Sequence, residues 1–378
     1  MNCDFIEEIK YLENLKSFPT QPVFSENMMK KQKIIVYGGG NGFITLSMFV
    51  LQRFNIIPEI VFDKKYSVSE RRNGTLFCHP DHFVPSKEIL EKSLVIISLG
   101  NAEIRQQVKS TLVKHGYKNV ISAVDIYEYH LPNPSPEIHQ GFCFYKNAFP
   151  EIMQVLGLLK DENSREIFKQ FLFTHLYRKR LDIPSEPVEN QYFPLDIWDN
   201  SVYDRTIICG AYDGDTSLAI FKRIPQVNSM ICIEPDPENF EKMQKNIQPY
   251  KGNVKKLVLL PLGVYDKNVQ MRFASGNVSN CAIAEDGDLL IQCVALDDCL
   301  PDEAPTLISM DVEGVELQAL RGMTKIIKKH RPKLAICVYH SPEHIWKIPL
   351  FLHEIVPDYQ FCLRNYSSFT SETVLYAW

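Results

Sequence analysis

Short apolar runs alternate with helix-like segments along most of this chain, and this alternation restricts the fold more than any other feature. In the first half the runs are KIIVY, EIVFD, SLVIISLG and NVISAVD, which begin at Lys33, Glu59, Ser93 and Asn119. A second series begins with TIICG at Thr206. Strands that alternate with helices form mainly parallel sheets with helices on both faces. The sequence therefore predicts an α/β protein with two Rossmann-like domains.

The second series continues to the C-terminus through SMICIEPD, VKKLVLLPLGVYD, PTLISMD, PKLAICVYH, YQFCLRNY and TVLYAW. We interpret it as an open sheet that ends in an antiparallel pair. An inserted hairpin with a polar loop (273–288) interrupts the series and is expected to help choose the ligand. Ligands of such sheets bind outside the carboxyl ends of the strands.

Proline-rich stretches and the two series together predict the domain boundaries. We expect an N-terminal helix and loop at 1–30 and a small Rossmann-like domain at 31–131. A linker and helical segment at 132–195 follows the break PNPSPE, and the second domain occupies 196–378.

Composition excludes several classes of protein. The net charge of −5 lacks the basic footprint of a nucleic-acid binder. The acidic N-terminus is unlike a signal peptide, and no apolar run reaches the roughly 20 residues that span a bilayer. Scattered cysteines, most of them in apolar runs (Cys209, Cys232, Cys281, Cys293, Cys337 and Cys362), fit buried thiols in a reducing compartment. We therefore expect a cytoplasmic protein, and a polar loop rather than a zinc site around Cys78, His79 and His82.

The turn GAYDGD joins the first strand of the second series to a helix. Gly210 and Gly214 allow a sharp turn, and the helix N-terminus offers free N–H groups to an anion. Glu234 ends the next strand, where a carboxylate can accept hydrogen bonds from ribose hydroxyls. A helix cap is the alternative role for Glu234, and we favour the ribose role. Gly263 and Val264, with Asp266 nearby, are expected to contact an adenine ring.

Acidic residues and a histidine follow the fourth and fifth strands. Asp311, Glu313 and Glu316 lie within MDVEGVE, and Tyr339 and His340 end the run CVYH. Such acids can hold a sugar hydroxyl, act as a base or bind a divalent cation, with Asp311 and Glu313 as the candidate ligands. His340 is a candidate acceptor of a hydroxyl proton, although a lone histidine is usually structural.

The order of GAYDGD, IEPDPENF, LDD, MDVEGVE, GM and RPKLAICVYH resembles the FkbM family of S-adenosylmethionine-dependent methyltransferases. The resemblance runs from about Phe149 to the C-terminus and implies a seven-stranded class I methyltransferase sheet. It implies methyl transfer to a hydroxyl oxygen of a small molecule or glycan, such as a sugar of a surface polysaccharide. It also implies that Gly210, Ala211, Tyr212 and Gly214 hold the methionine end of the cofactor, that Glu234 holds its ribose, and that Asp311, Glu313 and His340 face the acceptor.

One position departs from the family pattern. Many members carry an acid two residues before the first glycine of the turn, where this chain has Ile208. Asp213 or Asp215 could replace its contact with the ammonium group of the cofactor. As the base we nominate His340 first and Asp311 second.

The first half repeats the strand, glycine turn and acid with GGGNG and Asp63. Gly38, Gly40 and Gly42 miss the dinucleotide spacing, because Phe43 stands where the third glycine belongs. About four strands are expected here. Ligand binding and a purely structural role fit equally well. Two rival functions therefore stay open: an NAD- or nucleotide-sugar-binding oxidoreductase that uses this half, and a non-catalytic nucleotide-binding module.

Overall fold

The structure is a computed structural model that describes residues 3–17, 19, 29–52, 54–99, 102–123, 126, 142–177, 181, 183–273, 289–367 and 370–378. The chain divides into two compact units. The larger unit comprises Met1–Glu13, Lys146–Leu172 and Leu181–Trp378, and the smaller one comprises Asn14–Tyr145 and Phe173–Arg180. The first helix and much of the helical segment before residue 172 thus belong to the same unit as the C-terminal sheet.

The larger unit is built on a seven-stranded sheet with the order β15-β16-β14-β13-β7-β8-β9. Its strands are β7 (Arg205–Cys209), β8 (Val227–Ile233), β9 (Val254–Leu260), β13 (Leu307–Met310), β14 (Lys333–Cys337), β15 (Phe361–Asn365) and β16 (Thr373–Ala377). Strand β16 runs antiparallel to β14 and β15, and the other pairs are parallel. The predicted seven-stranded sheet with a final antiparallel pair is confirmed.

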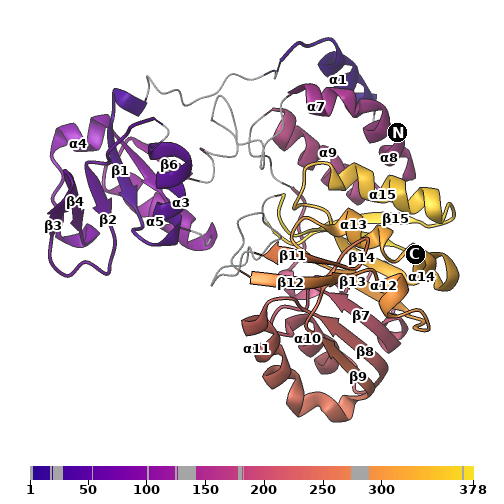
Figure 1. The fold of residues 1–378 in the computed structure, drawn as a ribbon. Coiled ribbons are helices and arrows are strands. Elements are labelled where there is room, and N and C mark those ends of the chain that lie inside the picture. The colour runs from indigo at the N-terminus through magenta and orange to yellow at the C-terminus, as the bar shows by residue number, and fades with distance from the viewer. Residues whose placement is uncertain are drawn as a thin grey trace. The chain divides into compact units, whose positions relative to one another are not determined.

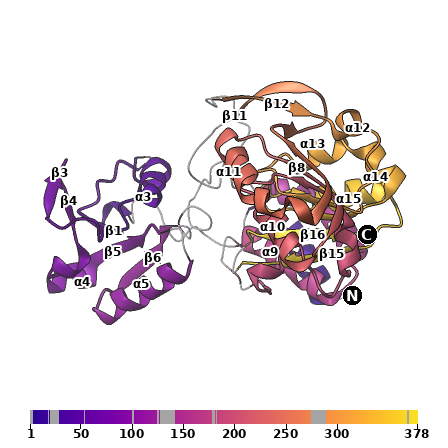
Figure 2. The same cartoon turned by 90° about the horizontal axis from the view of Figure 1, so that it is seen from below.

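Helices cover both faces of this sheet (Figures 1 and 2). On one side lie α10 (Asp215–Arg223) and α11 (Pro237–Ile247), and on the other lie α13 (Glu316–Arg321), α14 (Thr324–His330) and α15 (His344–Ile355). The unit also contains α1 (Cys3–Glu13), α8 (Phe149–Leu158), most of α9 (Glu162–Leu176), α12 (Leu296–Cys299) and 3₁₀ turns at Val188–Asn190, Asn200–Asp204 and Gln248–Asn253. The apolar stripe of α1, formed by Phe5, Ile9 and Leu12, is buried at helical spacing.

Side chains of α10 and α11 fill the space over the central strands. Ile220 and Phe221 of α10 belong to one core cluster with Met243 of α11 and with Met230 and Cys232 of β8. Burial of this apolar surface holds the helices to the sheet. It also fixes the turn between β7 and α10 at the carboxyl edge of the sheet.

A hairpin interrupts the series as predicted, and a short further strand extends it to a three-stranded sheet. The sheet comprises β10 (Gly263–Val264), β11 (Val269–Phe273) and β12 (Leu289–Val294) in the order β10-β12-β11, and β11 and β12 pair antiparallel. Phe273, Ile291 and Cys293 form its small core. The rest of the predicted polar loop, 274–288 with Cys281, lies outside the described residues, as does the break at 132–137.

The smaller unit has a six-stranded sheet with the order β3-β4-β2-β1-β5-β6. The strands are β1 (Lys33–Tyr37), β2 (Ile60–Phe62), β3 (Glu70–Arg72), β4 (Thr75–Cys78), β5 (Ser93–Ile97) and β6 (Asn119–Ser122). The helices are α3 (Asn41–Leu46), which continues as a π-helical turn (Ser47–Leu51), α4 (Lys87–Lys92), α5 (Ala102–Lys114) and most of α7 (Phe142–Asn147), with a 3₁₀ turn at Pro80–His82. Ile34 and Val36 pack with Leu46, whereas Ile35 packs on the opposite face with Leu112 of α5.

The expectation of about four strands in this unit was wrong. Strands β3 and β4 form an additional hairpin around Asn73 and Gly74, which both have positive φ values, of 48° and 86°. Asn-Gly is a strong signal for such a two-residue turn. All three residues of β3 are exposed, so the usual apolar alternation was missing. Cys78 ends β4 and is buried, so the polar-loop prediction was also wrong for this residue.

The described cysteines are free thiols, and Cys209, Cys232, Cys293, Cys337 and Cys362 are buried as predicted. Within the described part of the chain, no helix is both long enough and apolar enough to cross a membrane.

Candidate active site

A cavity of about 720 Å³ opens at the carboxyl ends of the central strands of the seven-stranded sheet. Many of the residues that the sequence singled out line it, among them Gly210, Tyr212, Glu234, Gly263, Val264, Asp311, Glu313 and His340. The cavity therefore brings the candidate cofactor residues and the candidate acceptor residues to one place.

Gly210 occupies a position that excludes any other residue. Its φ of 77° is in the left-handed region, and a Cβ atom there would lie 1.7 Å from the backbone oxygen of Asp311. The turn after β7 thus packs directly against the end of β13. Tyr212 also has a positive φ, of 47°, and Gly214, with φ 89°, is the N-cap of α10. The turn thus combines three uncommon backbone conformations, and Gly210 and Tyr212 line the cavity.

Glu234 follows β8, and its carboxylate is hydrogen-bonded both to the glycine turn and to the residue that caps α11. Its Oε2 accepts a hydrogen bond from the Tyr212 N–H at 2.8 Å, and its Oε1 accepts one from the Asp236 N–H at 2.9 Å. The cap of α11 is made by Asp236, which accepts from the Asn239 N–H, so Glu234 does not have the capping role. Burial raises the pKa of Glu234 to about 7, although the two backbone hydrogen bonds act to lower it. Each oxygen keeps a lone pair for a ligand.

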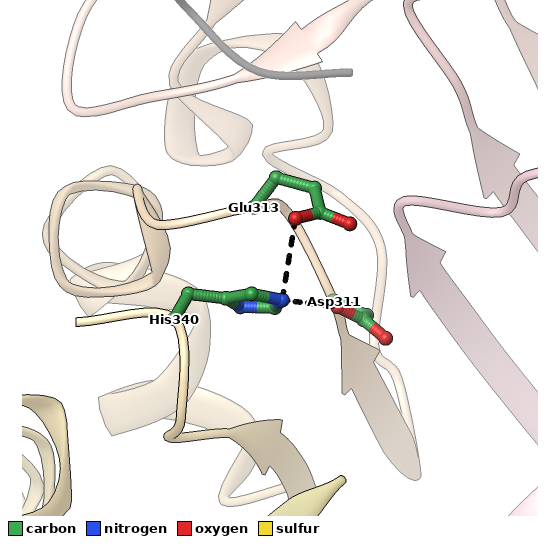
Figure 3. Close-up of side chains that lie close together, drawn as sticks. All are labelled: Asp311, Glu313 and His340. Atoms are coloured by element: carbon green, nitrogen blue, oxygen red, sulfur yellow. Dashed lines mark ion pairs between the residues drawn. The ribbon is translucent and has the colours of Figure 1, made fainter. Parts of the chain in front are cut away.

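Asp311, Glu313 and His340 meet because β13 and β14 are neighbouring parallel strands (Figure 3). Nε2 of His340 lies 3.4 Å from Oδ1 of Asp311 and 3.5 Å from Oε2 of Glu313. Glu313 has a φ of 55°, which is uncommon for a residue with a side chain. Backbone strain of this kind is concentrated at functional sites.

Glu316 contacts the side of the His340 ring that faces away from Asp311 and Glu313. Its side chain has no exposed surface, and its Oε1 lies 2.7 Å from Nδ1 of His340. Oε2 lies 3.0 Å from Nδ1 of His344, and Oε1 also accepts hydrogen bonds from the N–H groups of Val312 and Gly314. Burial alone would raise the pKa of Glu316, but the hydrogen bonds with the two histidines hold it well below its usual range.

The carboxylates around His340 favour its protonated, positively charged form. Burial acts to lower the pKa of His340, but the hydrogen bond to Glu316 and the neighbouring carboxylates raise it to about 9. Burial raises the pKa of Glu313 to about 7 and also raises the pKa of Asp311. At neutral pH, without a ligand, His340 therefore carries a proton, whereas Glu313 is close to half-ionised.

Several residues of the site were missed by sequence reasoning. Tyr192 donates from its hydroxyl to Oδ2 of Asp311 at 3.0 Å. Glu372 accepts from Gln191 at 2.8 Å and from Tyr339 at 3.4 Å. Gln191 and Tyr192 lie in the loop before β7, and Glu372 directly precedes β16. No pattern of residue types in these loops indicated a role in the site.

Other predicted residues lie outside the cavity lining. Ala211 is buried, Gly214 packs against Met243 and Ile247, and the backbone oxygen of Asp213 accepts from Asn246. Asp266 is also absent from the lining, whereas Asp215 and the buried Ile208 contribute to it. Of the two acids proposed to compensate for Ile208, Asp215 is therefore the one that reaches the cavity.

The seven strands have the order β15-β16-β14-β13-β7-β8-β9, with β16 antiparallel to its neighbours. This order, with a glycine turn after β7 and an acid after β8, is that of a class I methyltransferase fold. Residues 209–365 match the Methyltransferase FkbM domain family. The chain thus contains an FkbM methyltransferase domain, and its fold and family support dependence on S-adenosylmethionine.

Among solved structures, the chain is similar to the methyltransferase FkbM from Methylobacillus flagellatus KT. The TM-score is 0.73 at 20% identity, over 100% of this chain and 99% of that chain. A likeness at this identity shows a shared fold.

Two further matches are with the fibrillarin from Aeropyrum pernix in complex with S-adenosyl-L-methionine and with a precorrin-6y C5,15-methyltransferase from Geobacter metallireducens GS-15. The first has a TM-score of 0.30 at 11% identity, over 46% of this chain and 66% of that chain. The second has a TM-score of 0.29 at 14% identity, over 46% of this chain and 80% of that chain. Scores of this size do not establish a shared fold. A search of curated proteins found no match to the chain.

Proposed function

We propose that this protein is an S-adenosylmethionine-dependent O-methyltransferase that acts on a hydroxyl group of a sugar or glycan precursor. The observation that carries the proposal is the single cavity that joins the glycine turn and Glu234 to Asp311, Glu313 and His340. In this reading Glu234 accepts hydrogen bonds from the ribose hydroxyls, and Gly263 and Val264 contact the adenine. The turn from Gly210 to Gly214 holds the methionine end.

The lining of the cavity favours a neutral, hydroxyl-rich acceptor. Among the described residues that line it, the carboxylates are Asp215, Glu234, Asp311, Glu313 and Glu372, and none is a lysine or arginine. Carboxylates accept hydrogen bonds from sugar hydroxyls, whereas phosphate groups are usually bound by arginine and lysine. A neutral sugar ring therefore suits this surface better than a phosphorylated one.

The reaction needs alignment and the removal of one proton. The methyl carbon leaves the sulfur of the cofactor as the C–S bond breaks, and it forms a C–O bond with the acceptor. S-adenosylhomocysteine is the second product. The hydroxyl proton passes to a base and then to solvent. Because His340 is protonated at neutral pH, its raised pKa favours Glu313 or Asp311 as the base, with His340 stabilising the developing oxyanion.

Single-turnover transfer of a labelled methyl group to a panel of mono- and oligosaccharides tests this proposal. Alanine at His340 or Asp311 is expected to lower the rate at least 100-fold, within the usual range of general acid–base contributions. If both variants keep the full rate, the assignment of the acceptor side is wrong. If S-adenosylmethionine binds but none of the sugars is methylated, the non-catalytic module becomes the better account.

One contact in the smaller unit favours a second function, the binding of a nucleotide. Oδ2 of Asp63 accepts from the Gly39 N–H at 2.7 Å, and Oδ1 accepts from the Lys65 N–H at 3.0 Å. Glu234 bridges the turn of the larger unit in the same way. Calorimetric titration of the whole protein with NAD and with S-adenosylmethionine separates the two functions. Binding of NAD that is lost in Asp63→Ala would support the oxidoreductase reading.

A further inference from the structure

Asp311, Glu313 and His340 all line the cavity. Their side chains lie close together and present three donor atoms to one small volume (Figure 3). One atom from each side chain lies within 4.8 Å of the other two. Nε2 of His340 is 3.4 Å from Oδ1 of Asp311 and 3.5 Å from Oε2 of Glu313. Neither Nε2 of His340 nor Oδ1 of Asp311 has a hydrogen-bond partner among the described residues, although both atoms are buried.

These separations are typical of neighbouring ligands of a metal ion. Two donors at right angles, each about 2.2–2.4 Å from an ion, lie about 3.1–3.4 Å apart. A direct hydrogen bond between such atoms would bring them closer, to about 2.7–3.2 Å. The observed spacing therefore leaves room for an ion between the atoms.

In His340 and Asp311, the polar atom that does not face the cluster already has a hydrogen-bond partner. Nδ1 of His340 pairs with Oε1 of Glu316 at 2.7 Å, and Oδ2 of Asp311 accepts from the Tyr192 hydroxyl at 3.0 Å. Histidines that bind metals usually donate their second N–H to a carboxylate, which fixes the tautomer and the orientation of the ring. With Nδ1 as the donor, an ion that binds here displaces the proton from Nε2, and the lone pair of Nε2 then faces the ion.

The residues that hold His340 in place are buried and hydrogen-bonded. The His340 side chain is 9% exposed and Glu316 is fully buried, while His344 and the backbone N–H of Val312 hold Glu316 from other directions. Asp311 and Glu313 remain partly open toward the cavity, so water or a hydroxyl group of a substrate can complete the coordination.

We propose that Asp311, Glu313 and His340 bind one divalent cation. Two carboxylates and one imidazole suit an ion that accepts both oxygen and nitrogen donors, such as Mn²⁺. The proposal rests on the geometry of the three side chains and does not require the proposed methyl transfer. If that proposed function holds as well, the ion lies beside the acceptor and lowers the pKa of a hydroxyl group bound to it.

Binding of Mn²⁺ alone tests the site. The whole protein is dialysed against a chelator and titrated with Mn²⁺, and free Mn²⁺ is followed by electron paramagnetic resonance. We expect one site per chain, and at least a tenfold loss of affinity in His340→Ala and in Glu313→Gln. Glu316→Gln should weaken binding about 10- to 100-fold, because Glu316 orients His340 without contacting the ion.

Glu241→Gln is the matched control, because Glu241 forms a largely exposed ion pair with Lys245 and does not line the cavity. It should change the Mn²⁺ affinity less than threefold. Wild-type protein that binds no Mn²⁺ at millimolar concentration, or binding that His340→Ala and Glu313→Gln leave unchanged, would overturn the proposal. Circular dichroism melting of each variant verifies that it is folded. Calorimetry with S-adenosylhomocysteine on the same preparations reports separately on the cofactor site, so the two proposals can fail independently.

Discussion

The imidazole of His340 is held by Glu316: Nδ1 lies 2.7 Å from Oε1 of a carboxylate that has no exposed surface. Nδ1 of His344 lies 3.0 Å from Oε2, the other oxygen of the same carboxylate. A buried charge of this kind is stable only while its partners remain in place. The relationship therefore links the stability of the domain to the orientation of His340, which we propose faces the acceptor.

Glu316→Ala should lower the free energy of unfolding by about 3–5 kcal/mol, because it leaves buried histidines without their counter-charge. Chemical denaturation of the two proteins measures the difference. Glu241→Ala is the control, since the Glu241–Lys245 pair is largely exposed, and the change there should stay below about 1 kcal/mol. If the two substitutions changed the free energy of unfolding equally, the buried contacts of Glu316 would contribute no more than an exposed ion pair.

Gly210→Ala should abolish cofactor binding and destabilise the domain. A methyl group at this position would collide with the backbone oxygen of Asp311 at 1.7 Å, and the φ of 77° is strained for alanine. Gly157→Ala is the matched change, because Gly157 lies in α8 with no atom within 4 Å of the added carbon. It should be neutral or stabilise by up to about 1 kcal/mol. Thermal melting and calorimetry together check both effects, and a fully stable, ligand-competent Gly210→Ala would contradict the geometry.

Tyr192→Phe should reduce methyl transfer while the fold is retained. The ring stays, but Oδ2 of Asp311 loses the hydroxyl that donates to it at 3.0 Å. A buried acceptor without its partner costs about 1–3 kcal/mol, which can appear as lower stability or as a displaced carboxylate. We expect at least a tenfold lower single-turnover rate with an unchanged affinity for S-adenosylhomocysteine. A rate equal to that of the wild type would show that Tyr192 has no part in positioning Asp311.

Affinity for the cofactor should rise with pH through about 7. Burial raises the pKa of Glu234 to about 7 in the free protein, and only the ionised carboxylate accepts hydrogen bonds from both ribose hydroxyls. Protonation therefore competes with binding below that pH. At pH 6 the ionised fraction is roughly one tenth of its value at pH 8, so the dissociation constant should be about tenfold higher. In Glu234→Gln this step in the pH profile should disappear, and a step that persists there must come from another group.

The alternation of apolar runs was sufficient to predict an open sheet with a final antiparallel pair, because central strands such as β13 and β14 are almost continuously buried. The family resemblance added the expectation of a seven-stranded methyltransferase sheet. The alternation was also sufficient to expect Asp311 and His340 at one edge, because the carboxyl ends of parallel neighbours lie together. The β3–β4 hairpin escaped prediction because Glu70, Arg71 and Arg72 bury no face.

The support around the cluster could not be read from local patterns. Tyr192 and Asp311 are 119 residues apart, and their contact depends on how the loop before β7 folds over the sheet. Glu316 was noted only as one of three acids, since nothing in MDVEGVE distinguishes a buried carboxylate from an exposed one. Only the packing of α13 and α15 brings its carboxylate into contact with both His340 and His344.

The most direct test of the account is calorimetric titration of the whole protein with S-adenosylhomocysteine, repeated with Glu234→Ala. The account predicts one binding site per chain and at least a tenfold loss of affinity in the variant. Absence of binding to the wild-type protein, or equal affinity in both proteins, would contradict the claim that this cavity holds the adenosyl group.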